Sequence, residues 1–178
     1  MKSIASAPGK IILFGEHFVV HGTPAILAAI DKRVTITSAF TDNKTIKVNS
    51  QLGTIEVPMS SSHEEVESEF RPFVYLANEM ITSNQNVNGL EITINSDIPI
   101  GVGLGSSSAC CVAATASISG LFKEVSSEEN LKMSIKAEKT IFPDTSGADC
   151  TVCTYGGIIE YDKINGSKKI LMRLILIF

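Results

Sequence analysis

The sequence predicts an α/β (α+β) fold, and three observations support this expectation. Short apolar runs separated by turn residues occupy most of the first sixty positions, a pattern typical of β-strands. Residues 90–94 alternate strictly between apolar and polar side chains, which indicates a half-buried strand. A glycine-rich loop and two segments with helical character follow that strand, so helices are expected beside the strands.

The first half of the chain is expected to be mainly β-structure. Residues 4–20 predict a β-hairpin in which Ile11–Phe14 and Phe18–Val20 are separated by Gly15-Glu16-His17. The acidic segment 60–69 is expected to open a helix that continues at helical spacing to Met80. Further short strands are expected at 23–28, 34–39, 46–48 and 54–57.

The second half predicts two helices and two more strands. The strand 90–94 runs into the glycine-rich segment Gly101–Ser108, and the small residues that follow suit a tightly packed helix ending near Phe122. Ser126 with Glu129 three residues later forms a capping box, which predicts a helix that ends at Pro143. Strand-like runs are expected at 151–154 and 158–161.

Composition and charge exclude several classes of partner. The chain has 178 residues, with 15 basic and 19 acidic side chains and a formal charge of −4. Because the basic residues are outnumbered and form no block of five or more, nucleic acid is not an expected partner. The first residues lack the apolar core of a signal peptide, and the apolar run 170–178 is too short to span a membrane. We therefore expect a cytoplasmic protein without a membrane partner.

The four cysteines are expected to be small buried side chains. Cys150 and Cys153 have the spacing of half a zinc site, but Cys110 and Cys111 are adjacent and cannot supply a second C-x-x-C pair. Free cysteine in a reducing compartment is commonly buried as an apolar residue.

The glycine-rich loop is the strongest local signal for a ligand. Glycines at 101, 103 and 105 let the backbone approach an anion closely, and the helix that follows presents unpaired N–H groups. The loop contains no Gly-Lys-Ser/Thr, and Ser106 stands where a dinucleotide-binding loop has its third glycine. Its three serines could bind phosphate oxygens or Mg²⁺, whereas the alternative is an ordinary turn ending in a serine cap.

Glu138 is expected on the apolar face of its helix, in line with Leu131, Ile135 and Phe142. A buried carboxylate requires a partner, so a metal ion or a cation is expected beside it. The alternative is a glutamate at the edge of the apolar stripe, paired with a lysine.

Other polar residues carry weaker signals when taken alone. Lys10 follows Pro8-Gly9 and has the context of a solvated hairpin lysine, and Asp149 has the context of a turn or cap residue. His17 and His21 have a metal-ligand spacing only on a helix, and no third ligand is apparent.

Three separated motifs together resemble the GHMP kinases. They are residues 8–22, the loop 101–108, and the segment from Glu138 through Gly147-Ala148-Asp149 to Gly157. Within this family, Gly-Glu-His-Phe-Val-Val-His-Gly at 15–22 and lysine at position 10 resemble the mevalonate kinase branch rather than the galactokinases. The resemblance implies a mixed β-sheet with helices on one side, the fold of ribosomal protein S5 domain 2.

The resemblance also implies roles for individual residues. Lys10 and Asp149 would be catalytic, with Asp149 as general base and Lys10 contacting both Asp149 and the transferring phosphoryl group. Ser107 and Glu138 would hold Mg²⁺. Glu16, His17 and Asp149 would contact the substrate. The residues expected around ATP are Lys10, Ser96, Gly101, Val102, Gly103, Leu104, Gly105, Ser106 and Ser107.

The implied reaction transfers the γ-phosphoryl group of ATP to the 5-hydroxyl of mevalonate, an early step of isoprenoid synthesis. Phosphomevalonate kinase, homoserine kinase and a non-catalytic nucleotide-binding remnant remain alternatives, and the choice between monomer and homodimer stays open. Residues 1–165 are expected to form the N-terminal ATP-binding domain. The apolar tail 166–178 is expected to mark a truncation before the family's C-terminal domain.

Overall fold

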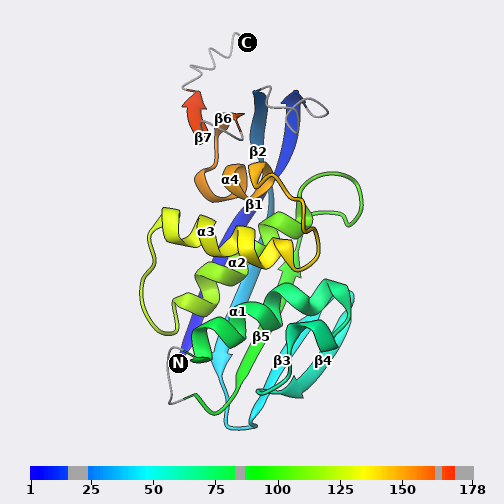
Figure 1. Cartoon of the computed structure of the whole chain (residues 1–178), viewed down its shortest axis with the longest axis vertical. Helices are drawn as coiled ribbons and strands as arrows, with labels where there is room; N and C mark the ends of the chain where they lie inside the picture. The colour runs from blue at the N-terminus through cyan, green and yellow to red at the C-terminus, as the bar shows by residue number, and fades with distance from the viewer. Residues whose placement is uncertain (16–23, 83–86, 163–165, 171–178) are drawn as a thin grey trace.

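The computed structural model describes residues 1–15, 24–82, 87–162 and 166–170, which form one mixed β-sheet with a layer of helices on one face (Figure 1). The strand order is β4-β3-β5-β2-β6-β7, and β1 pairs with β2. The strands are β1 (Lys2–Phe14), β2 (Ala25–Phe40), β3 (Thr45–Ser50), β4 (Gly53–Pro58), β5 (Leu90–Ser96), β6 (Ile158–Asp162) and β7 (Gly166–Ile170).

The two longest strands, β1 and β2, form an antiparallel pair through the middle of the molecule. From Ala25 on, the short runs expected at 23–28 and 34–39 are parts of one strand, β2. Between these two runs the pairing of β1 with β2 changes register: Pro8 lies opposite Arg33, but the next residue, Gly9, lies opposite Ile30. The polar residues Asp31 and Lys32 therefore form a bulge instead of ending the strand. The hairpin partner expected at 18–20 lies outside the described residues.

The strands expected at 46–48, 54–57, 90–94 and 158–161 are confirmed as β3, β4, β5 and β6. β3 pairs in parallel with β5, whereas the other pairs are antiparallel, so the sheet is mixed. β7 pairs with β6, so the sheet continues past residue 165. Alternate residues of β5 are buried, as the sequence pattern predicted.

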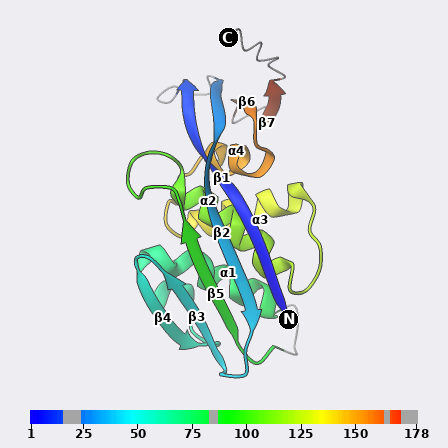
Figure 2. The same ribbon diagram turned by 180° about the vertical axis from the view of Figure 1, so that it is seen from behind.

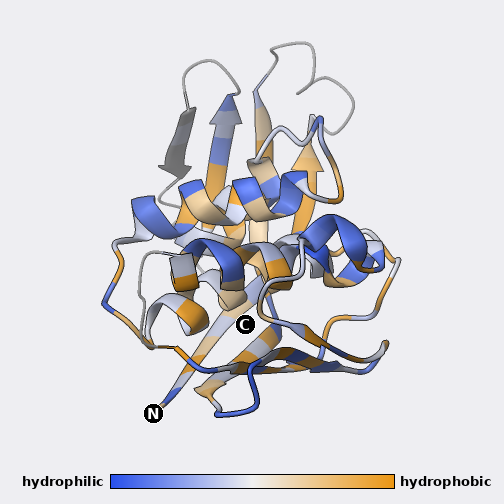
Figure 3. Cartoon of the chain, turned by 60° about the horizontal axis from the view of Figure 1, so that its bottom comes forward, coloured by the Kyte–Doolittle hydropathy of each residue, from blue (hydrophilic) through white to orange (hydrophobic). Residues whose placement is uncertain are grey.

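Four α-helices cover one face of the sheet, and the described helices leave the opposite face bare (Figure 2). They are α1 (Arg71–Thr82), α2 (Ser106–Ser119), α3 (Ser127–Lys139) and α4 (Ala148–Tyr155). Hydrophilic and hydrophobic segments alternate along these helices, as expected when one side faces a core (Figure 3). No described helix has both the length and the apolar character needed to cross a membrane.

Helix α2 lies at the centre and contacts β1, β2 and the other three helices. Its buried side chains are mostly small, among them Ala109, Ala113 and Ala114, so neighbouring elements approach it closely. The apolar core lies between α2 and the sheet. Its largest fully buried side chains include Leu27, Ile36, Leu76, Leu90, Ile92, Ile118 and Ile159.

Three predictions about the helical regions need correction, and the capping box is confirmed. The capping box of Ser126 and Glu129 is present at the start of α3, although the helix ends at Lys139, before Pro143. Segment 60–69 contains two short 3-10 turns, η2 (His63–Glu65) and η3 (Ser68–Phe70), and α1 begins only at Arg71. The strand expected at 151–154 was wrong, since these residues lie within α4.

Candidate active site

The glycine-rich loop connects β5 to α2. Gly101, Gly103 and Gly105 have φ angles of +77°, +76° and +72°, a region that side chains with a Cβ rarely adopt. α2 starts immediately afterwards at Ser106, with Gly105 as its N-cap. The unpaired N–H groups of the first turn therefore follow directly from the loop, an arrangement suited to binding an anion.

Strand β1 packs against this loop and is hydrogen-bonded to it. The backbone N–H of Lys10 donates to the carbonyl oxygen of Leu104 at 2.9 Å. A Cβ added to Gly9 would lie 2.8 Å from that oxygen, and one added to Gly105 would lie 2.6 Å from Cγ of Lys10. Glycine at both positions therefore allows strand and loop to pack against each other.

Lys10 and Asp149 form an ion pair, with 3.0 Å between Nζ and Oδ2. The lysine side chain is 7% exposed and the aspartate side chain 31%. The interpretation of Lys10 alone as a solvated hairpin lysine was therefore wrong: its charge is buried beside a carboxylate. Asp149 lies in the first turn of α4, which begins after Gly147. The contact between the two residues that the family resemblance implied is present.

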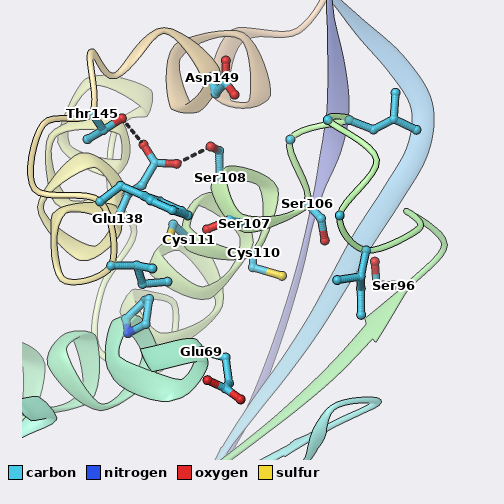
Figure 4. A pocket seen from close by; sticks show the side chains of 18 of the residues that line it. Glu69, Ser96, Ser106, Ser107, Ser108, Cys110, Cys111, Glu138, Thr145 and Asp149 are labelled. Atoms are coloured by element: carbon cyan, nitrogen blue, oxygen red, sulfur yellow. Dashed lines mark hydrogen bonds between the residues drawn. The ribbon is translucent and has the colours of Figure 1, made fainter. Parts of the chain in front are cut away.

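Glu138 projects from α3 into the interior and is only 3% exposed. One carboxylate oxygen accepts a hydrogen bond from Ser108 Oγ. The other accepts one from Thr145 Oγ1 at 2.6 Å, and Figure 4 shows the carboxylate between these two hydroxyls. The alternative of an edge glutamate paired with a lysine is thus wrong, because the carboxylate is buried and bound by hydroxyl groups.

The residues around Glu138 fit a bound Mg²⁺ ion. Two neutral hydroxyl donors leave the negative charge of the buried carboxylate uncompensated. The buried Ser107 Oγ has no hydrogen-bond partner among the described residues, although buried hydroxyls are normally satisfied. Mg²⁺ prefers oxygen ligands and is commonly held by one or two carboxylates together with substrate phosphates.

The glycine-rich loop, Ser107, Glu138 and Asp149 line one cavity of about 650 Å³, and Lys10 contacts this lining through Asp149. Ser96 also lines it, and its hydroxyl exchanges hydrogen bonds with the backbone of Ile98. Sequence reasoning missed the apolar wall, because its members come from separate segments and share no motif. They include Leu52, Phe70, Phe73 and Ile141.

Sequence reasoning also missed Ser108 and Thr145 as partners of Glu138. The run of three serines at 106–108 signalled hydroxyl groups but not which of them reaches the carboxylate. Thr145 carried no signal, since its contact depends on the loop between α3 and α4. Glu16 and His17, expected to contact the substrate, lie outside the described residues.

The cysteines lie on α2 and α4, and Cys110 and Cys111 line the cavity. Cys111, Cys150 and Cys153 are buried and Cys110 is half-buried, which confirms the expectation of small packed thiols. Burial raises the pKa of Cys110 to about 12 and raises the pKa of the other three thiols as well. All four are therefore protonated near neutral pH, and unreactive thiols are expected.

The fold and the sequence both point to the same class of protein. The family profile described as "GHMP kinases N terminal domain" matches residues 72–157. The structure of a galactokinase from Lactococcus lactis has the same fold, with a TM-score of 0.79 at 21% identity over 95% of this chain and 47% of the other. The chain therefore has the fold of a GHMP kinase N-terminal domain, as its motifs predicted.

Within that class, the similar proteins include several mevalonate kinases. The mevalonate kinase of Thermococcus onnurineus is 40% identical over 93% of this chain and 53% of its own length. The mevalonate kinase of Pyrococcus furiosus is 40% identical over 92% of this chain and 52% of its own length. The crystal structure of Methanococcus jannaschii mevalonate kinase has a TM-score of 0.82 at 31% identity, over 96% of this chain and 56% of the other. The chain thus spans about half the length of these relatives.

Proposed function

We propose that the protein transfers the γ-phosphoryl group of ATP to the 5-hydroxyl of mevalonate. The observation that carries this proposal is the meeting of an anion-binding loop, Asp149 and the buried carboxylate of Glu138 around one cavity, with Lys10 paired to Asp149. Phosphoryl transfer depends mainly on positioning and on compensation of negative charge. The mevalonate kinases that are 40% identical support the choice of substrate.

The loop and the start of α2 would bind the phosphates of ATP. The N–H groups of residues 101–107 provide donors, and the α2 N-terminus provides partial positive charge. Leu104 is fixed to β1 by its hydrogen bond with the Lys10 N–H. The position of the phosphates is thereby linked to the position of the Lys10 side chain.

Asp149 would act as the general base. Its carboxylate accepts the proton of the 5-hydroxyl as the hydroxyl oxygen attacks the γ-phosphorus, and the bond from that phosphorus to ADP breaks. The Nζ of Lys10, 3.0 Å from the carboxylate, would contribute positive charge next to the transferring group. Lys10 also fixes the direction of the Asp149 carboxylate.

Ser107 and Glu138 would hold Mg²⁺. Bound Mg²⁺ supplies charge compensation for the β- and γ-phosphates of ATP. The unpartnered hydroxyl of Ser107 and the buried carboxylate of Glu138 support this assignment. Glu16 and His17 are proposed to contact mevalonate, on the family resemblance alone.

A phosphorus NMR time course of the protein with ATP, Mg²⁺ and mevalonate tests the proposal. A phosphomonoester signal that appears together with ADP is the expected result, and the Asp149→Asn variant should produce neither. Phosphomevalonate and homoserine are tested in parallel. Faster turnover of either would show that this compound, and not mevalonate, is the preferred substrate. Binding of Mg-ATP without turnover of any acceptor would favour a nucleotide-binding role.

A further inference from the structure

The loop between α3 and α4 contains a hydroxyl with an unusual set of partners. Thr145 Oγ1 donates to Oε2 of Glu138 at 2.6 Å and accepts a hydrogen bond from the backbone N–H of Gly147 at 3.3 Å. Gly147 is the N-cap of α4, and Asp149 lies two residues further on. One hydroxyl thus joins the buried carboxylate to the turn that carries the proposed general base (Figure 4).

We propose that Thr145 is a positioning residue that orients the Glu138 carboxylate for metal binding, an inference that rests on the proposed function. The carboxylate of Glu138 lies at the end of a flexible side chain with three torsion angles, so burial alone does not fix the plane of the carboxylate. Ser108 on α2 constrains one oxygen, and Thr145 constrains the other from the opposite side. Each oxygen retains lone pairs for a cation.

The residues around Thr145 support its role in positioning the Glu138 carboxylate. Lys10, the buried cation of the site, pairs with Asp149. The turn that carries Thr145 is itself held, because Tyr161 donates its hydroxyl proton to the carbonyl oxygen of Ser146. Thr145 therefore acts from a fixed backbone. Loss of its hydroxyl should free one Glu138 oxygen and leave the phosphate loop unchanged.

The test separates metal binding from nucleotide binding. The affinity of a non-hydrolysable ATP analogue is measured by calorimetry with and without Mn²⁺, which replaces Mg²⁺ as the probe. In Thr145→Val we expect the metal-free affinity to stay within about twofold, and the gain produced by Mn²⁺ to fall about tenfold, as for one lost charge-assisted hydrogen bond. Thr145→Ser keeps the hydroxyl, so in this variant Mn²⁺ should raise the nucleotide affinity as much as it does in the unmodified protein.

Thr140→Val is the matched control. Thr140 is the C-cap of α3 and its hydroxyl donates to the carbonyl oxygen of Ala137 at 2.7 Å, so Thr140→Val removes a hydroxyl bond that does not involve the Glu138 carboxylate. If Thr145→Val does not fold, Thr145→Ala takes its place in the same titration. An unchanged Mn²⁺ gain in the hydroxyl-free variant, or no restoration by Thr145→Ser, would overturn the positioning role.

The same titration distinguishes the two proposals. If the unmodified protein binds the nucleotide analogue without any gain from Mn²⁺, the proposed kinase function fails, and the role of Thr145 fails with it. If the unmodified protein shows the gain and Thr145→Val keeps it in full, only the role of Thr145 fails.

Discussion

Removal of one charge from the Lys10–Asp149 pair should have unequal effects on stability, depending on which residue is changed. At 3.0 Å the two charges attract each other by about 5 kcal/mol at an effective dielectric constant of about 20, an attraction that desolvation partly offsets. Asp149 is 31% exposed and can return to water when its partner is lost, but Lys10 is 7% exposed and cannot.

The expected costs follow from this difference in exposure. Asp149→Asn leaves a buried ammonium group without a counter-charge and should cost about 3 kcal/mol, since the amide oxygen still accepts one hydrogen bond. Lys10→Met keeps the apolar stem and leaves a carboxylate that water can reach, so its cost should be about 1 kcal/mol. For a domain of this size, the melting temperatures should fall by about 6–12 °C and 2–4 °C respectively.

Thermal unfolding followed by circular dichroism measures both variants under identical conditions. Lys132→Met serves as the control, because Lys132 pairs with Glu128 on the exposed surface of α3 and its loss should leave the melting temperature unchanged. Equal losses for the two site variants, or a larger loss for Lys10→Met, would refute the argument from unequal burial.

Four further outcomes are expected. Gly105→Ala should lower stability more than Gly101→Ala, because both have positive φ but only the Cβ at 105 would meet Lys10, at 2.6 Å; urea titration compares them. Ser107→Ala removes an unpartnered buried hydroxyl and should leave stability unchanged or raise it by up to about 1 kcal/mol, while raising the Mg²⁺ concentration needed for nucleotide binding. Mass spectrometry after iodoacetamide treatment at pH 8 should find Cys110 and the other thiols unmodified until the protein is unfolded, because burial raises their pKa. Since the unfolded chain releases thiol protons near pH 9.0 and the folded chain retains them, stability should also fall as pH rises above that value; a flat urea midpoint between pH 8 and 11 would contradict this linkage.

Local sequence signals predicted the elements whose structure is set locally. The alternation at 90–94 and the capping box at Ser126 depend on residues within a few positions, and both are confirmed. The run Thr151-Val152-Cys153-Thr154 favoured a strand by propensity, yet it lies in α4. Three of its residues are buried there, so tertiary packing outweighed the local preference.

Within the candidate site, the success of prediction depended on the separation of the partners along the chain. The glycine-rich loop is continuous and could be recognised by itself. Lys10 has the local context of a solvated residue, and its partner Asp149 lies 139 positions later, so only a comparison of whole motifs brought them together. Thr145 and Ser108 were missed because side-chain direction at Glu138 is decided by packing between α2 and α3.

The hydrogen bond between the Lys10 N–H and Leu104 also bears on the order of folding. It joins β1 to a loop more than ninety residues later in the chain, and contacts of such separation form slowly. Because the loop is bonded to β1, we expect it to reach its final position only after β1 has paired with β2. Recovery of nucleotide affinity during refolding would therefore report completion of the central strand pair, and a bound fluorescent nucleotide would follow that event in real time.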